Sequence, residues 1–308
     1  MEKIEVPKTF EKKYKEILTE RDYQNFISLV NFKPRKSIRI NTIKIKKERL
    51  ARRLERKGWI LERIPWYEDG FYVNVVEELA KTLEYYLGYY YIQEAASMIP
   101  PLVLDPKPGE IVLDMCAAPG SKTTQMAQMM ENEGIIVAID DSLKRLKALR
   151  INIQKMGIKN TVAILMDARR FWKKGLKFEK ILLDVPCSGS GTFLTTPSVF
   201  KTWSPYLVGR MSKLQKELLI SAWKSLDEDG ILVYSTCSLD PEENEAIIDF
   251  AIRKLGAKVE RIKLKNVKTR EGITKYEKLR FEKEVRKCVR IWPQDNLTEG
   301  FFICRLRK

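Results

Sequence analysis

The sequence predicts an α/β protein with a doubly wound parallel sheet, preceded by a smaller α+β unit. From about residue 105, short apolar runs alternate with segments of helical periodicity, the pattern of strand–helix–strand units in a parallel sheet. Before that point the alternation is absent, and 308 residues are enough for two domains. We therefore expect an N-terminal domain over residues 1–104 and a larger domain over residues 105–308.

The larger domain is expected to begin after Asp-Pro-Lys-Pro-Gly at 105–109, where proline and glycine interrupt the pattern. Its expected elements are, in order, strand 110–116, helix 121–130, strand 134–141, helix 142–157, strands 161–167 and 180–186, helix 204–226 and strand 230–238. Ligands of such sheets bind at the carboxyl ends of the strands.

One further helix is expected directly after the last of these strands. Asp240 suits the N-cap, Pro241 the first helical position, and Glu243 has the spacing of a capping box. Arg253 and Lys254 fall in the last turn, and Gly256 ends the helix. This arrangement predicts that Cys237 lies on a short loop between a strand and a helix.

The N-terminal domain has a different pattern. We expect a helix over residues 14–32, a strand over 37–45 and a basic helix over 46–58. Two more strands are expected over 59–64 and 71–75.

The net charge of +16 is unevenly distributed. Residues 33–63 hold 13 Lys and Arg against 3 Asp and Glu, and residues 251–308 hold 18 against 7. The rest of the chain carries a net charge of −5. Two local basic segments favour a polyanion such as RNA as the partner, over the alternative of an evenly solvated surface.

The composition also excludes several classes of protein. No apolar run approaches the about 18 residues of a membrane span, and residues 1–18 lack a signal-peptide pattern. The chain has no histidine and no C-x-x-C pair, so we expect no metal. Five cysteines argue against a disulfide framework, and Cys288 and Cys304 suit buried apolar positions. We expect a soluble, cytoplasmic, monomeric protein without a membrane partner.

The segment that joins the first strand of the larger domain to its first helix is a candidate ligand loop. Its sequence is DMCAAPGSKTTQ (114–125). A phosphate-binding P-loop needs G-x-x-x-x-G-K-[ST], and a dinucleotide loop needs G-x-G-x-x-G; the loop has the glycines of neither. A pyrophosphate is therefore a poor fit, although small residues and a helix N-terminus favour close approach of a ligand.

Carboxylates follow three successive strands of the predicted sheet. Asp114 ends the first, Asp140 the second and Asp167 the third. Asp140 lies 20 residues after Gly120, which suits a carboxylate that accepts from ribose hydroxyls. Helix capping is the alternative role for each. Together, without a pyrophosphate loop, they predict S-adenosylmethionine as the cofactor.

Two cysteines, Cys187 and Cys237, also follow strands of this sheet. Without histidine, Cys–His and Ser–His catalysis are excluded, and a thiol is the strongest nucleophile present. A thiolate that adds to carbon 6 of a pyrimidine makes carbon 5 reactive toward a sulfonium methyl group. Asp184, three residues before Cys187, is placed to neutralise charge at ring nitrogen 3.

These motifs resemble the NOL1/NOP2/Sun family of RNA cytosine-5 methyltransferases. The resemblance is carried by DMCAAPGSKTTQ (114–125), DVPCSGSGTF (184–193), YSTCSLDPEENE (234–245), SIRINTIK (37–44), YIQEAASM (91–98) and the C-terminal segment from 290. It implies a Rossmann-like S-adenosylmethionine-dependent methyltransferase sheet with a small N-terminal α+β RNA-recognition domain.

The resemblance also implies roles for particular residues. Cys237 is expected to attack carbon 6, and Cys187 to assist product release; Asp184 and Lys122 complete the expected catalytic set. The expected cofactor-binding residues are Cys116, Ala117, Ala118, Pro119, Gly120, Ser121, Lys122, Asp140, Arg145, Asp167 and Asp184. Asp184, Cys187 and water are alternative acceptors for the carbon-5 proton.

The compact chain most resembles archaeal-type tRNA enzymes of the family, so we expect tRNA in preference to rRNA as substrate. One alternative is an RNA-binding assembly factor with a vestigial methyltransferase fold; retention of Cys187, Cys237, Asp184 and Lys122 argues against it. DNA cytosine methylation is a further alternative, and the second thiol and the lack of a separate target-recognition insert argue against DNA as partner.

Overall fold

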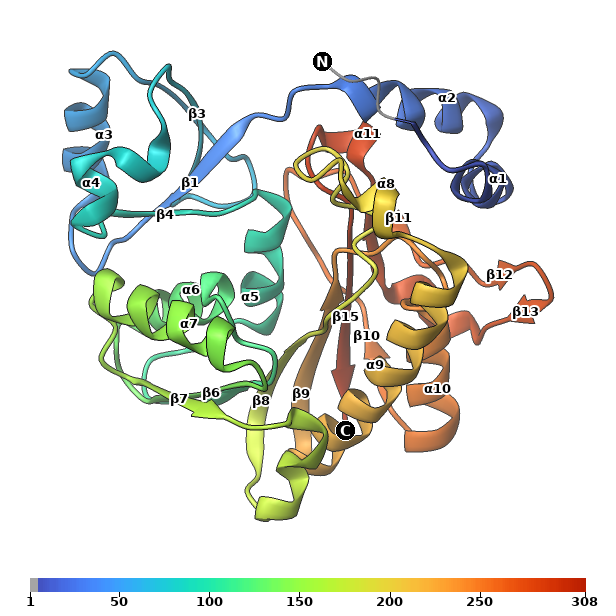
Figure 1. The fold of residues 1–308 in the computed structure, drawn as a ribbon. Helices are drawn as coiled ribbons and strands as arrows, with labels where there is room; N and C mark the ends of the chain where they lie inside the picture. The colour runs from blue at the N-terminus through green and yellow to red at the C-terminus, as the bar shows by residue number, and fades with distance from the viewer. Residues whose placement is uncertain (1–4) are drawn as a thin grey trace.

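The computed structural model describes residues 5–308, which form two large β-sheets and a two-stranded hairpin with helices around them (Figure 1). The strands of the larger sheet are β5 (Ile111–Asp114), β6 (Ile135–Asp140), β7 (Thr161–Leu165), β8 (Phe178–Asp184), β9 (Leu226–Thr236), β10 (Lys258–Glu260), β11 (Arg270–Glu271), β14 (Val289–Ile291) and β15 (Phe301–Arg307). The hairpin is β12 (Lys275–Tyr276) with β13 (Leu279–Arg280).

The larger sheet has the strand order β11-β14-β15-β9-β8-β5-β6-β7, with β10 paired to β15. Strands β7, β6, β5, β8 and β9 are parallel to one another. This confirms the predicted doubly wound parallel sheet. Strands β15, β14 and β11 extend it in antiparallel fashion beyond β9, which the sequence pattern did not predict.

Helices cover both faces of this sheet (Figure 1). They are α5 (Ile99–Leu104), α6 (Ser121–Met129) and α7 (Leu143–Met156) on one face, and α9 (Pro205–Ser225) and α10 (Glu245–Leu255) on the other. Alternate residues of a strand point to opposite faces. Leu182 packs in the cluster that contains Ile99 and Met126, whereas Leu183 packs with Leu219 and Ile247.

The smaller sheet lies in the N-terminal part of the chain and is entirely antiparallel, in the order β2-β3-β1-β4. Its strands are β1 (Lys36–Ile40), β2 (Ile60–Arg63), β3 (Gly70–Asn74) and β4 (Tyr90–Ile92), and the associated helices are α3 (Lys47–Glu55) and α4 (Leu83–Tyr86). Leu50 and Leu54 of α3 pack on Ile38 and Ile40. The expected basic helix and the strands over 59–64 and 71–75 are thus confirmed as α3, β2 and β3, whereas the strand expected over 37–45 ends at Ile40 and residues 41–45 form a turn.

Short helical segments complete the description of the chain. They are η1 (Leu29–Asn31), η2 (Leu79–Lys81), η3 (Ala96–Met98), η4 (Ala168–Lys174), η5 (Lys283–Lys287), α8 (Val199–Thr202) and α11 (Pro293–Asn296). None of the helices that the structure describes within residues 5–308 is long and apolar enough to span a bilayer.

The single helix expected over residues 14–32 is wrong. The structure has two helices there, α1 (Lys8–Ile17) and α2 (Glu20–Ser28). The side chain of Thr19 accepts a hydrogen bond from the backbone N–H of Asp22 at 3.2 Å. A threonine in this position starts a new helix, because it satisfies a donor of the first turn.

Helices α1 and α2 pack against a later part of the chain. Phe10 lies edge-on to Phe200 and Trp203, with ring centroids 5.1 and 5.0 Å apart, and Phe26 makes a similar contact with Phe193. The first two helices therefore pack directly on the loop region that follows β8. The division into domains at residues 105–109 stays a prediction.

The expected start of the helix after β9 is also wrong, since α10 begins at Glu245 with Asn244 before it. Asp240 does not cap it. Its carboxylate is buried and accepts from Ser188 and Trp203 instead. Tertiary hydrogen bonds have replaced the local capping box, and the end of the helix at Gly256 is as expected.

A buried ion pair connects β14 to α10, just beyond the Cys237 loop. Arg290 donates two hydrogen bonds to Glu245, both at 2.6 Å, and a third to the carbonyl of Leu239 at 3.0 Å. Neither charged side chain is accessible to solvent.

We expect Arg290→Met to lower the free energy of unfolding by about 3–5 kcal/mol, because it leaves the Glu245 carboxylate buried without a partner. The double variant Arg290→Met, Glu245→Leu should recover most of that loss. Guanidinium denaturation followed by tryptophan fluorescence measures the free energy of unfolding of the double variant and of each single variant, Arg290→Met and Glu245→Leu. A double variant as unstable as the sum of the two single variants would contradict a coupled pair.

Candidate active site

The two candidate catalytic thiols are brought together by strand pairing. Strands β8 and β9 are parallel neighbours, with Asp184 opposite Ser235. The loops that follow them therefore leave the same edge of the sheet. The sulfur atoms of Cys187 and Cys237 lie 3.1 Å apart, within the contact distance of a thiol hydrogen bond.

An ion pair lies beside the thiols. Lys122 Nζ donates to Asp184 Oδ2 at 2.6 Å, and Ser235 Oγ donates to Asp184 Oδ1 at 2.7 Å. Lys122 lies in the first turn of α6, and its ammonium group is 5.2 Å from the centre of the Phe301 ring. The structure thus places Lys122, Asp184, Cys187 and Cys237 in one site.

The protonation of this site follows from its burial. The contact with Cys237, together with burial, raises the pKa of the Cys187 thiol well above its usual range. Burial alone would lower the pKa of Lys122, but the attraction of Asp184 outweighs it and the pKa is raised. At neutral pH, Cys187 therefore keeps its proton and Lys122 its positive charge.

A buried polar network holds the two cysteine loops behind the thiols. Ser188 and Ser238, which follow the two cysteines, have their hydroxyls 3.3 Å apart. The hydroxyl of Ser188 donates to Asp240 Oδ2 at 3.1 Å, and that of Ser238 lies 3.2 Å from the same oxygen. Glu243 accepts from the backbone N–H of Ser188 at 3.0 Å and from the hydroxyl of Ser238 at 2.9 Å. The separation of the two thiols is fixed by these bonds.

Lys13 of α1 completes the network from the far end of the sequence. Its ammonium group lies 2.6 Å from Asp240 and 2.8 Å from Glu242. Burial alone would raise the pKa of Asp240, but Lys13 outweighs it and lowers that pKa. Burial and the nearby Asp240 raise the pKa of Glu243 to about 7.

A pocket of about 260 Å³ lies at the carboxyl ends of β6 and β7 and contains four of the predicted cofactor-binding residues. Its lining includes Cys116, Asp140, Arg145 and Asp167, with Met115, Pro186, Leu214 and Leu218 as apolar walls. The volume approaches the about 300–1,000 Å³ of ligand pockets. The carboxylates can accept hydrogen bonds from hydroxyl or amino groups, and the apolar wall can contact a purine ring. The pocket therefore suits the nucleoside part of S-adenosylmethionine.

The loop over residues 117–120 borders this pocket. The backbone N–H of Ala118 donates to Asp140 at 3.2 Å, and Arg145 lies 3.4 Å from the same carboxylate. Gly120 has a φ of +104°, and a Cβ there would lie 2.7 Å from Leu149. A glycine is thus required where α6 begins.

The predicted residues divide into two neighbouring groups. Lys122 and Asp184 lie toward the thiols, and Cys116, Asp140, Arg145 and Asp167 lie around the pocket. The remaining predicted residues lie between them: Ala117, Ala118, Pro119 and Gly120 form a loop, and Ser121 is the first residue of α6. Asp167 also caps η4 and pairs with Arg169, so it has the helix-capping role that was the alternative for each strand-end aspartate.

Asp114 does not line this pocket. It is 1% exposed and accepts from the hydroxyl of Thr123 at 2.7 Å. Its function here is to connect β5 to α6 at the base of the cofactor loop.

Sequence analysis missed the residues that support the site. Ser235 and Phe301 touch the Lys122–Asp184 pair, and Ser188, Ser238 and Glu243 support the thiols. The repeated Cys-Ser dipeptide at 187–188 and 237–238 was the available signal.

Comparison with known proteins agrees with this geometry. The profile described as 16S rRNA methyltransferase RsmB/F matches residues 101–307, and that of the N-terminal domain of 16S rRNA methyltransferase RsmF matches residues 6–95. The fold and the site define an S-adenosylmethionine-dependent methyltransferase. The chain belongs to the RsmB/F family, the NOL1/NOP2/Sun family of RNA cytosine-5 methyltransferases. The family that the motifs resemble is thereby confirmed.

Similar proteins include enzymes named for two RNA classes. A tRNA (cytosine(49)-C(5))-methyltransferase of Pyrococcus abyssi is 46% identical over 280 residues, 90% of this chain and 89% of that protein. Ribosomal RNA small subunit methyltransferase F of Shewanella amazonensis is 39% identical over 296 residues, 92% of this chain. The match covers 60% of that longer protein.

Solved structures superpose over nearly the whole chain. A methyltransferase homolog protein from Pyrococcus horikoshii has a TM-score of 0.88 at 36% identity, covering 99% of this chain and 96% of that one. NSun6 from the same organism, determined with SFG, has a TM-score of 0.87 at 28% identity, covering 98% of both chains.

Burial makes the stability of the cofactor loop depend on pH. It raises the pKa of Asp114 to about 7, against about 3.9 in an unfolded chain. The stability linked to this group is complete below about pH 4 and is lost as the pH rises through about 7.

We expect the free energy of unfolding of the wild type to fall, relative to that of Asp114→Asn, by up to about 1.4 kcal/mol per pH unit between pH 4 and 7. Guanidinium denaturation at several pH values measures the difference. Glu179→Gln, at an exposed strand position, serves as the control. Parallel pH profiles for the wild type and Asp114→Asn would contradict the assignment.

Proposed function

We propose that this enzyme methylates carbon 5 of a cytosine in tRNA, with Cys237 as the attacking thiol and Cys187 assisting release. The observation that carries the proposal is the pair of thiols 3.1 Å apart beside the Lys122–Asp184 ion pair. A single-thiol mechanism would not need the second sulfur in contact with the first.

The steps follow from the geometry. The Cys237 thiolate adds to carbon 6, the S–C6 bond forms, and the C5=C6 electrons make carbon 5 nucleophilic. S-adenosylmethionine supplies, when bound, the methyl group that carbon 5 takes. A base then removes the carbon-5 proton, the C5=C6 bond re-forms and the S–C6 bond breaks. The elimination returns Cys237 to the thiolate.

The surrounding side chains support these steps. The ammonium group of Lys122 lies close enough to attract the Cys237 thiolate, which adds to the effect of Asp184 in raising the pKa of Lys122. In our proposal Asp184, held by Lys122 and Ser235, faces ring nitrogen 3. In its carboxylic acid form it gives this nitrogen a proton as negative charge develops there, and the proton returns to Asp184 when the S–C6 bond breaks. Cys187 keeps its proton and donates it in a hydrogen bond to the departing sulfur of Cys237.

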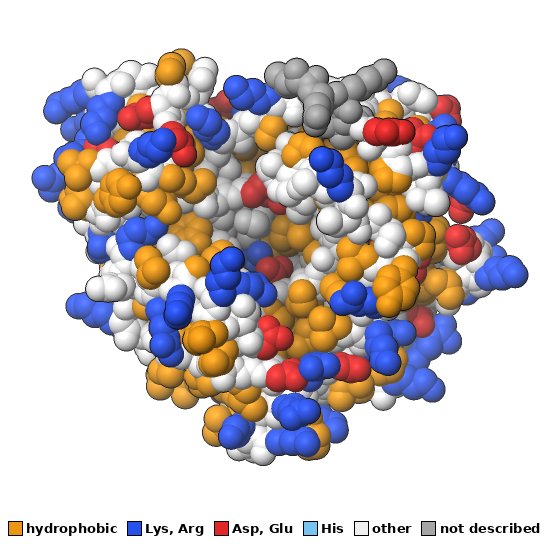
Figure 2. Space-filling model, in the orientation of Figure 1, with side chains coloured by type: hydrophobic (Ala, Val, Ile, Leu, Met, Phe, Trp, Pro, Cys, Tyr) orange, Lys and Arg blue, Asp and Glu red, His pale blue; other side chains and the backbone are white. Residues whose placement is uncertain are grey.

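The target base must leave its stack to reach the thiols. Cys187 and Cys237 are only partly exposed, so a base inside a helix cannot reach them. Figure 2 shows a hollow in the middle of the molecular face, bordered by Lys and Arg side chains together with Asp, Glu and apolar ones. An unpaired or flipped cytosine can enter there, and the phosphates meet positive charge.

The preference for tRNA rests on similarity over whole chains. The tRNA enzyme of Pyrococcus abyssi is matched over 89% of its length, and the rRNA enzyme of Shewanella amazonensis over 60%. Methylation of rRNA is therefore the second candidate. An assembly factor without activity is disfavoured, because Lys122, Asp184, Cys187 and Cys237 all lie in contact distance of a partner.

The division of labour between the thiols is tested by two variants incubated with labelled tRNA and S-adenosylmethionine. We expect Cys187→Ala to accumulate a covalent protein–RNA adduct on a denaturing gel, because release is impaired. Cys237→Ala should form no adduct and transfer no methyl group.

Cys288→Ala, a thiol of the core, is the control and should turn over without an adduct. An adduct that requires Cys187 and survives loss of Cys237 would reverse the two roles. Cofactor binding to each variant, measured by calorimetry, shows whether the site is intact.

The RNA class is tested with three substrates: a tRNA transcript, the same transcript with cytosine 49 replaced by uracil, and a small-subunit rRNA fragment. By analogy with the Pyrococcus abyssi enzyme, we expect bisulfite sequencing to find methylation at cytosine 49 of the first alone. Methylation of the rRNA fragment with the tRNA untouched would assign the enzyme to the ribosome.

A further inference from the structure

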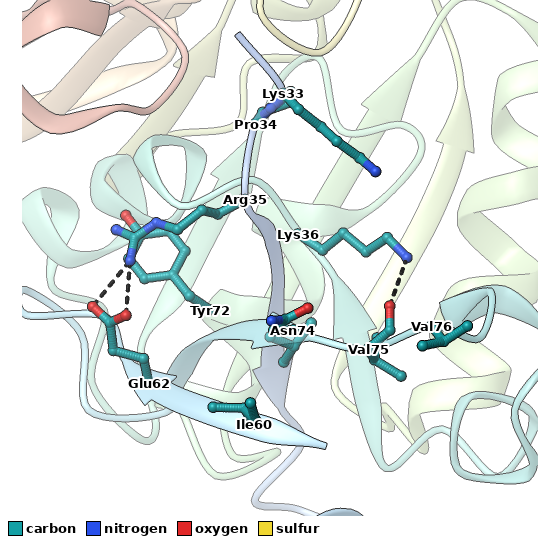
Figure 3. Close-up of a pocket in the computed structure, with 11 residues that line it drawn as sticks. Lys33, Pro34, Arg35, Lys36, Ile60, Glu62, Tyr72, Asn74, Val75 and Val76 are labelled. Carbon is teal, nitrogen blue, oxygen red and sulfur yellow. Dashed lines mark hydrogen bonds and ion pairs between the residues drawn. The ribbon is translucent and has the colours of Figure 1, made fainter. Parts of the chain in front are cut away.

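A groove on the N-terminal sheet has no part in the chemistry described above. It has a volume of about 710 Å³ and lies where the chain enters β1 and crosses the outer ends of β2 and β3 (Figure 3). Its principal residues are Lys33, Arg35, Lys36, Tyr72, Asn74 and Val76. Basic, aromatic and apolar side chains are thus combined in one open depression.

The planar guanidinium group of Arg35 is held in a fixed orientation on one side of the groove. Both carboxylate oxygens of Glu62 accept from its Nη1, at 3.0 and 2.9 Å. Its guanidinium carbon lies 3.5 Å from the centre of the Tyr72 ring. The side chain is still 37% exposed. One face of the guanidinium plane is therefore covered by Tyr72, and a planar group can stack on the other.

Two lysines occupy the other side. In Figure 3, the side chains of Lys33 and Lys36 both point toward the side of Val75 and Val76, whereas Arg35 points to Tyr72 and Glu62. Lys36 is steadied by the carbonyl oxygens of Val75 and Glu77, each 3.4 Å from Nζ. Carbonyls do not neutralise an ammonium group, so both lysines keep charge for an anion.

Apolar surface lies next to these charges. Val76 is fully exposed and Ile60, on the edge strand β2, is 65% exposed. A cationic groove with stacking and apolar surfaces is the combination that binds single-stranded nucleic acid.

The groove is connected to the cofactor side of the enzyme. The sheet face that carries Tyr72 continues to Arg39, which is fully buried. Arg39 donates to Thr124 at 2.7 Å and to Gln128 at 2.8 Å, both on α6. Since α6 also carries Lys122, the groove is held in a fixed position relative to the thiols.

We propose that this groove binds one unpaired nucleotide of the RNA substrate away from the target cytosine. The base stacks on Arg35, the sugar contacts Val76, and the phosphate lies between Lys33 and Lys36. This inference rests on RNA being the substrate, as proposed above.

The test uses a fluorescein-labelled tRNA transcript and measures anisotropy at several KCl concentrations. Lys33→Gln, Lys36→Gln should weaken binding and reduce the slope of log Kd against log salt by about 1, because one phosphate contact is lost. Arg35→Lys keeps the positive charge but removes the planar guanidinium group on which a base can stack. It should weaken binding by about tenfold with the slope unchanged, as expected when one base loses its stacking partner.

The control removes two lysines elsewhere. Lys159 and Lys174 are exposed and precede β7 and β8. They lie at the amino ends of these strands, whereas the thiols follow the carboxyl ends of β8 and β9. Lys159→Gln, Lys174→Gln should bind RNA as the wild type does. Groove variants that match this control, with wild-type KM for methyl transfer, would overturn the proposal and point to a protein as the occupant.

The two proposals fail separately. In turnover assays, the groove variants should show a raised KM for RNA and an unchanged kcat at saturating RNA, because the thiols are untouched. A wild-type enzyme that methylates no RNA would instead refute the proposed function. Thermal melting of each variant confirms that it is folded.

Discussion

The parallel pairing of β8 with β9 is the constraint on which the site depends. Two loops that carry thiols leave the same edge of the sheet only because these strands are neighbours with Asp184 opposite Ser235. A shift of register by one residue would turn alternate side chains to the other face and separate the two loops. The large core around Leu183 and Leu232 prevents such a shift, because both faces of these strands are covered by helices. Catalytic geometry is thus a consequence of core packing.

Charge balance is the second requirement, because burying an unpaired ion is costly. The loops carry Asp240 and Glu243 directly behind the thiols, and Lys13 neutralises the first. No cation among residues 5–308 pairs with Glu243. Burial with the neighbouring Asp240 raises the pKa of Glu243 to about 7, so it holds a proton for part of the time at neutral pH. The network therefore accommodates two carboxyl groups with one lysine. That lysine comes from α1, so the first helix of the chain is part of the support of the site.

The sequence predicted what local periodicity determines. The five parallel strands, the helices between them and the thiol positions at the ends of β8 and β9 follow from apolar runs and helix signals. The start of α10 was wrong because the Asp240 carboxylate has tertiary partners, Lys13 and Trp203, that no local pattern shows. The same limit explains why Ser188, Ser238 and Glu243 were missed: their function depends on contacts about 50 residues apart in the chain.

Two buried cations tie the N-terminal part of the chain to opposite sides of the catalytic apparatus. Lys13 reaches the cysteine loops, and Arg39 reaches the helix that follows the cofactor loop. Lys13 pairs with the buried Asp240, and Arg39 is bonded to several buried groups, so displacement of either would leave polar groups unsatisfied at a cost of about 1–3 kcal/mol each. The N-terminal sheet is therefore a rigid extension of the site. In our proposal, a nucleotide held on that sheet lies at a fixed distance from the thiols, so the spacing between two unpaired positions of an RNA would decide whether both sites can be filled at once.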